Sequence, residues 1–103
     1  MVVLLIAAVD LDERAFQEIE IVADELQRRA RSTEELVTRE NGMPISLSRG
    51  ANGAFPPALL RYYAHLITTT PQEEVRPSMV GHTIVRREAV GVVAAIVPWN
   101  YPQ

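Results

Sequence analysis

Residues 91–103 decide the fold, and they read Gly91-Val92-Val93-Ala94-Ala95-Ile96-Val97-Pro98-Trp99-Asn100-Tyr101-Pro102-Gln103. The run from Ala89 to Val97 is continuously apolar and rich in Val and Ile. Such a run is typical of a strand buried on both faces of a parallel sheet. Pro98 lacks the amide donor that a central ladder needs, so we expect the chain to turn there, just past the carboxyl end of the strand. Ligands bind at that edge in open α/β sheets.

The same residues resemble a known family. The stretch from Ile96 to Pro102, after Glu88-Ala89-Val90-Gly91-Val92, is similar to the first cofactor-domain strand of the NAD(P)-dependent aldehyde dehydrogenases. Upstream, residues 34–44 and 60–64 resemble the N-terminal helices of that family in the same order. Members of the family are several times longer, so the resemblance implies that this chain is a fragment.

The resemblance implies an α/β fold in which N-terminal helices precede two strands. It covers residues 32–103 well, residues 12–31 faintly and residues 1–9 not at all. We therefore predict one partial N-terminal region over residues 1–103, helical from 10 to 67. By resemblance, residues 82–88 form a strand of the oligomerisation sheet, and residues 89–103 form the first strand and turn of a Rossmann-like cofactor domain.

Composition excludes several classes of function. A chain of 103 residues with 48% hydrophobic and 22% charged content is ordinary for one soluble domain. The net charge is −3, and no basic cluster exceeds the pairs Arg28-Arg29 and Arg86-Arg87, so nucleic-acid binding has little support and is set aside. The absence of cysteine removes disulfides, thiolate zinc ligands and any thiol nucleophile.

The apolar start of the chain predicts neither a membrane span nor a secretory signal. Residues 1–9 are too few to cross a bilayer and have no basic flank. We expect a short buried strand or an apolar lead into the first helix, in a cytoplasmic protein.

Helix signals follow in order along the chain. Asp10 with Glu13 resembles a capping box before a helical apolar stripe that reaches Ala30, and Ser32 with Glu35 repeats the signature and predicts a second, short helix. Asn41-Gly42 predicts its left-handed cap.

The third helical region, residues 45–67, contains Pro56-Pro57, so we expect a break near Phe55 with a new first turn at the prolines. Residues 72–81 are predicted to be an exposed loop, because prolines 71 and 77 interrupt this region. A half-exposed strand is expected at residues 82–88.

Asn100 is the candidate catalytic residue. Its carboxamide NH2 can donate to an oxyanion, and the resemblance implies this role, because the matching asparagine of the family stabilises the thiohemiacetal. The alternative is that Asn100 merely forms the turn, as asparagine often does after proline. The resemblance places Trp99 beside the nicotinamide of NAD or NADP, with core packing as the alternative. Ile96, Val97 and Pro98 would shape the cofactor cleft, or simply pack as a strand.

Other polar and aromatic residues give weaker signals. His65 and His82 lack metal-ligand spacing, so we predict no metal site. Ser46 and Ser48 have no nearby base and are not nucleophile candidates. The pair Tyr62-Tyr63 is expected to pack a helix against the sheet.

The resemblance implies oxidation of an aldehyde to a carboxylic acid with NAD(P). The nucleophile and the general base of the family would lie beyond the position that matches Gln103, so we expect the chain alone to be inactive. Its partners would be the aldehyde substrate in a complete enzyme, and other copies or aldehyde dehydrogenase chains through self-association. The alternative is a non-catalytic interaction module or the relic of a truncated gene. The residues that would decide the aldehyde, or NAD against NADP, are not in this sequence.

Overall fold

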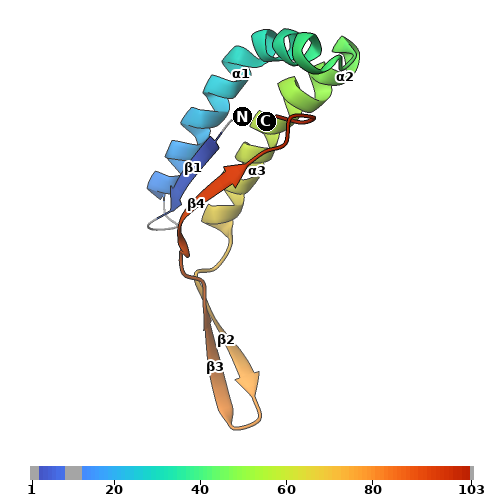
Figure 1. Ribbon diagram of the computed structural model, residues 1–103. Helices are drawn as coiled ribbons and strands as arrows, with labels where there is room; N and C mark the ends of the chain where they lie inside the picture. Colours follow the sequence, from blue (N-terminus) through green and yellow to red (C-terminus); the bar gives the residue numbers. More distant parts are fainter. Residues whose placement is uncertain (1–2, 9–12, 103) are drawn as a thin grey trace.

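The computed structural model describes the backbone of residues 3–8 and residues 13–102. The elements, in chain order, are β1 (Val3–Ala8), α1 (Glu13–Asn41), α2 (Ile45–Ser48), the π-helix η1 (Arg49–Ala54), α3 (Phe55–Thr69), β2 (Glu73–Ser78), β3 (Gly81–Arg86) and β4 (Gly91–Ile96). Helices α1 and α3 lie side by side, and the hairpin β2–β3 projects from one end of the molecule (Figure 1). This projection explains the elongated shape, 60 × 25 × 23 Å.

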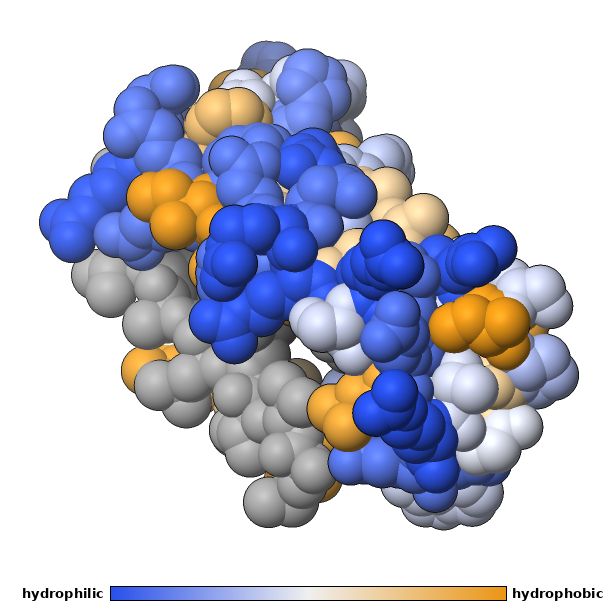
Figure 2. Space-filling model, turned by 90° about the horizontal axis from the view of Figure 1, so that it is seen from above, coloured by the Kyte–Doolittle hydropathy of each residue, from blue (hydrophilic) through white to orange (hydrophobic). Residues whose placement is uncertain are grey.

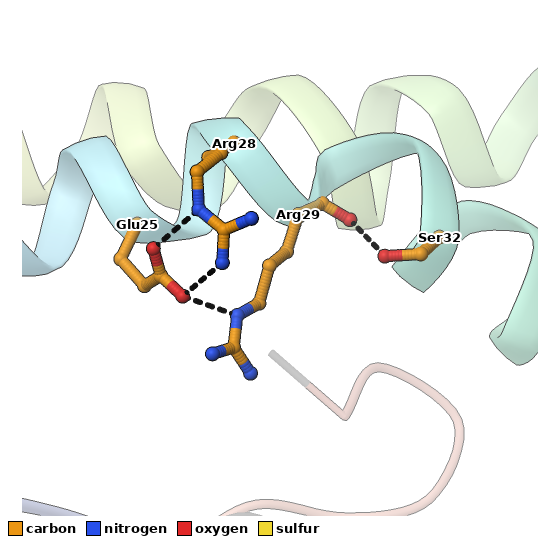
Figure 3. A network of polar contacts seen from close by, with 4 residues as sticks. All are labelled: Glu25, Arg28, Arg29 and Ser32. Carbon is orange, nitrogen blue, oxygen red and sulfur yellow. Dashed lines mark hydrogen bonds and ion pairs between the residues drawn. The ribbon is translucent and has the colours of Figure 1, made fainter.

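Helix α1 is a single helix of 29 residues, so the prediction of a second helix starting at Ser32 is wrong. The Ser32 hydroxyl donates to the carbonyl of Arg29 at 2.8 Å and does not cap a new helix (Figure 3). No glycine or proline interrupts residues 13–41, so nothing forces the helix to stop. The cap predicted at Asp10 lies outside the described residues.

Ion pairs between residues three or four apart connect the charged side chains of α1. Glu25 accepts hydrogen bonds from the guanidinium groups of Arg28 and Arg29 (Figure 3). These bonds, from Arg28 first and then Arg29, lower the pKa of Glu25 to about 2. The bond to Glu25 also raises the pKa of Arg28. On the face seen from above, hydrophilic residues predominate and hydrophobic ones form separate patches (Figure 2).

The end of α1 confirms the predicted left-handed cap. Gly42 has φ = 76°, and its amide donates to the carbonyl of Thr38 at 3.1 Å. The side-chain oxygen of Asn41 accepts from the amide of Met43 at 2.9 Å. A glycine is needed here because residues with a side chain rarely adopt this φ.

The predicted break near Phe55 is confirmed, and it takes the form of a π-helix. Pro56 and Pro57 have no amide hydrogen, so they cannot bond the carbonyls of Asn52 and Gly53 four residues earlier, as an α-helix requires. The amide of Phe55 bonds instead to the carbonyl of Gly50, five residues back. Helix α3 then starts at Phe55, with the prolines in its first turn.

Residues 73–78 form a strand, so the prediction of an exposed loop over residues 72–81 is wrong. β2 pairs antiparallel with β3 from Glu73↔Arg86 to Ser78↔Gly81. Pro77 is compatible with β2 because this strand lies at a sheet edge. A charge pair between Arg86 and Glu73, at 2.9 Å, also joins the strands. A strand is present where residues 82–88 were predicted to form one, but β3 ends at Arg86, so residues 87 and 88 lie outside it. Its place in an oligomerisation sheet stays a prediction.

β4 pairs with β1 in the antiparallel direction, from Val3↔Ile96 to Ala8↔Gly91. The expectation of a parallel strand buried on both faces is therefore wrong, since every residue of β4 is exposed. A continuous apolar run does not determine whether a strand pairs in the parallel or the antiparallel direction. Burial on both faces needs other elements packed above and below the sheet, and in the described part of the chain the two-stranded sheet does not have them. Of the two alternatives predicted for the start of the chain, a strand or an apolar lead into the first helix, residues 3–8 form the strand β1.

The core lies between α1 and α3 and is small. Its buried apolar residues include Ala23 and Val37 of α1 and Ala64 of α3. At its edge, Arg61 of α3 reaches Asp24 of α1 at 2.7 Å and Glu20 at 3.5 Å. Exposed ion pairs of this kind contribute only about 0.2–1 kcal/mol each.

Much of the apolar surface of α3 faces outward. Tyr62 and Tyr63 make an edge-to-face contact with ring centroids 5.3 Å apart. Their exposed fractions are 60% and 51%, so the expectation that they pack a helix against the sheet is wrong. The sequence showed two adjacent tyrosines, and in the structure their rings pack against each other.

Candidate functional site

The candidate site is the turn that follows β4. The strand ends at Ile96, and Trp99 and Asn100 form a turn. This turn is where the sequence predicted it, because Pro98 cannot donate to a neighbouring strand. Figure 1 shows this dark-red segment running from β4 back toward the end of the molecule where α1 meets α2.

The predicted site residues lie together along this segment, and most of them are exposed. Ile96 is the last residue of β4, Val97 is half-buried, and Pro98 and Asn100 are exposed. Trp99 is 76% exposed, so its indole does not pack in the core. The segment thus offers an apolar strand end and one exposed carboxamide. This arrangement can give a planar apolar ligand a surface and one hydrogen-bond donor.

A contact that the sequence did not reveal joins the turn to the helices. The side-chain NH2 of Asn41, at the end of α1, donates to the main-chain carbonyl of Trp99 at 3.4 Å. The sequence indicates Asn41 only as part of a helix cap. Nothing in the local sequence indicates a partner 58 positions away.

A buried polar cluster holds the π-helix on α1. Ser48 and Asn52 are 0% and 1% exposed. The Ser48 hydroxyl donates to the main-chain carbonyl of Glu34 at 3.1 Å, and the Asn52 NH2 donates to the Ser48 oxygen, also at 3.1 Å. The same NH2 lies 3.3 Å from the sulfur of Met43.

Gly53 lies beside this cluster, where a Cβ atom would come within 2.0 Å of a Glu34 carboxylate oxygen. The missing side chain of Gly53 therefore leaves room for the Glu34 carboxylate, which a Cβ atom here would push aside. The sequence predicted no nucleophile at Ser48, and it missed the structural role of this serine.

Residues of the described part of the chain line two cavities away from the turn. One, of about 430 Å³, is lined by Arg31, Glu34, Glu35, Ile45 and Arg49. The other, of about 210 Å³, lies where α3 meets the hairpin and is lined by Tyr63, Leu66, Ile67, Thr70, Gln72 and Arg87. Neither includes a predicted site residue.

Within residues 3–8 and 13–102, no group of three or more His, Cys, Asp or Glu side chains is arranged to hold a metal ion. In the same part of the chain, no helix combines the length and the apolar character needed to cross a membrane.

Comparison with known proteins identifies the family. The model of the aldehyde dehydrogenase family matches residues 6–103. The chain belongs to the aldehyde dehydrogenase family. This membership confirms the resemblance seen in the sequence. A search of solved structures gave no match.

Two relatives illustrate the similarity within the aldehyde dehydrogenase family. The geranial dehydrogenase of Castellaniella defragrans is 46% identical over 87 residues, which are 84% of this chain and 18% of that protein. The Bacillus subtilis protein named aldehyde dehydrogenase DhaS is 35% identical over 83 residues, which are 79% of this chain and 16% of that protein. The chain thus spans less than a fifth of the length of either relative.

Proposed function

We propose that this chain supplies the oxyanion donor and one wall of the cofactor site in an NAD(P)-dependent aldehyde dehydrogenase. The single observation that carries the proposal is the exposed turn after β4, which presents Asn100 directly beyond an apolar strand end in a chain that matches the family model. The proposed reaction of the complete enzyme is oxidation of an aldehyde to a carboxylic acid.

Asn100 would act on the carbonyl oxygen of the aldehyde. This oxygen gains negative charge when a thiolate, which this chain lacks, attacks the carbonyl carbon. A preorganised amide donor counts more for the charged transition state than for the bound aldehyde, so it accelerates the reaction. An exposed carboxamide on a turn is accessible to a bound aldehyde and can donate in this way.

The residues at the strand end fit one part of a dinucleotide cofactor. Ile96, Val97 and Pro98 offer an apolar edge, and the exposed indole of Trp99 offers a flat surface for a nicotinamide ring. When bound, NAD(P) would accept the hydride of the aldehyde. Among the described residues no glycine-rich loop follows a strand to hold the cofactor phosphates, so this chain would line only the nicotinamide end.

On this account, the isolated chain does not oxidise aldehydes. Removing one oxyanion donor from a complete enzyme costs about 10²–10³ in rate, so one donor alone cannot replace covalent catalysis. The division into a cofactor-domain strand and an oligomerisation strand, and a cytoplasmic location, are parts of the same proposal.

The projecting hairpin supports association with another chain of the family. Val75 and Ile84 lie opposite each other in the ladder and are 61% and 60% exposed. At the tip, Met79 and Val80 are almost fully exposed. Exposed apolar residues grouped in this way mark interaction sites.

The same exposed apolar residues of the hairpin also favour the second candidate function, a non-catalytic interaction module.

A chimera tests the proposed role. This chain would replace the matching segment of the Castellaniella defragrans geranial dehydrogenase, which supplies the rest of the fold. In an active chimera, Asn100→Asp keeps the shape of the side chain but removes its donor, and kcat should fall by about 10²–10³. A matched control is Gln17→Glu, which makes the same amide-to-carboxylate change on the exposed surface of α1. A fall of only a few-fold for Asn100→Asp would show that Asn100 only forms the turn.

A further inference from the structure

Asn41 lies at the end of α1 and uses both ends of its carboxamide. Its side-chain oxygen accepts from the amide of Met43 at 2.9 Å, which closes the helix end. Its NH2 donates to the carbonyl of Trp99 at 3.4 Å. Asn41 thus joins the end of the long helix to the turn that carries Asn100.

The two partners fix the orientation of this carboxamide independently. The main-chain amide of Met43 is a donor, so it must face the side-chain oxygen of Asn41. The carbonyl of Trp99 is an acceptor, so it must face the NH2. Both requirements give the same orientation, and exchanging oxygen and nitrogen would lose both bonds.

The position of Asn41 is itself well determined. The left-handed Gly42 reverses the chain, and its amide bonds to Thr38 in the last turn of α1. The side chain of Asn41 therefore projects from a fixed helix end. In contrast, the turn at Trp99 follows a strand in which every residue is exposed, so burial does not hold it.

We propose that Asn41 is a positioning residue that holds the Trp99–Asn100 turn against the end of α1. The bond to the Trp99 carbonyl restrains the peptide that leads into Asn100, and thereby the position of the Asn100 backbone from which its side chain extends. Only the catalytic consequence of this positioning rests on the proposed function. The mechanical link is a property of the chain as it stands.

Backbone dynamics test the link directly. In the ¹⁵N-labelled chain, the order parameter of the Asn100 amide should be near that of a rigid backbone, about 0.85, and should fall below about 0.6 in Asn41→Asp. The aspartate keeps an acceptor for the Met43 amide but has no donor for Trp99. Asn41→Ser should give the same fall, because its hydroxyl can close the helix end but is too short to reach the turn.

The matched control is Gln17→Glu, which makes the same amide-to-carboxylate change on the exposed surface of α1 and leaves both Asn41 and Gly42 in place. It should leave the Asn100 order parameter unchanged. As a second readout, fluorescence anisotropy decay of Trp99, the single tryptophan, should show greater indole motion in Asn41→Asp and not in this control.

The proposal is overturned if Asn41→Asp leaves the Asn100 order parameter unchanged, or if Gln17→Glu lowers it equally. In the second case the added carboxylate, and not the lost donor, would account for the change. The catalytic role of Asn100 is measured separately by kcat of the chimera, so either idea can fail without the other.

Discussion

Removing the hydroxyl of Ser48 should destabilise the packing of η1 on α1. This side chain is fully buried, donates to the Glu34 carbonyl and accepts from the Asn52 NH2. Ser48→Ala would leave the buried Asn52 NH2 with only the sulfur of Met43, a weak acceptor. A buried polar group that loses its partner costs about 1–3 kcal/mol. For a domain of roughly this size, each kcal/mol lowers Tm by about 4–8 °C.

The measurement is thermal unfolding followed by circular dichroism of the helices. Ser46→Ala is the matched control, because Ser46 lies in the same short helix α2 and is exposed. Exposed substitutions of this kind change the free energy of unfolding by less than about 0.5 kcal/mol. If Ser48→Ala and Ser46→Ala melted within about 2 °C of each other, the buried cluster would not stabilise the packing of η1 on α1.

Three further predictions concern pH, association and activity. The pKa of Glu25 in the folded state is lowered to about 2, so the stabilisation from its ionised carboxylate is present above the unfolded pKa of 4.5 and is lost as pH falls toward 2. The Tm difference between the parent and Glu25→Gln should therefore shrink over that pH range, and a constant difference would contradict this expectation. The parent chain should sediment as dimers or larger species at micromolar concentration, and Ile84→Lys should shift it toward monomer, whereas a monomeric parent would refute association. The purified chain should produce no NADH from aldehyde and NAD, and aldehyde-dependent NADH production that follows the chain through a second purification would overturn this expectation.

The local signals of the sequence predicted the end of α1 and the turn after β4 well. Gly42 ends α1 and Pro98 ends the ladder, because each residue restricts its own backbone conformation. The family was also recognisable from the residues around Trp99 and Asn100, and the family model matches residues 6–103.

What the sequence missed depends on competing local signals or on residues far apart in the chain. Ser32 carried a capping signature, yet no glycine or proline stopped α1, so its hydroxyl bonds within the helix. Val92 and Val93 were apolar enough for a buried strand, but burial depends on neighbouring layers, and β4 has only β1 beside it among the described strands. The link between Asn41 and Trp99 has no local signature, because it joins two segments that only the fold brings together.

The proposed donation from Asn100 to the oxyanion is tested by comparing kcat of the active chimera with kcat of its Asn100→Asp variant. We expect a fall in kcat of about 10²–10³ with little change in cofactor binding. The companion change Trp99→Ala should instead weaken cofactor binding. A kcat for Asn100→Asp within a few-fold of that of the parent chimera would show that Asn100 is not the oxyanion donor.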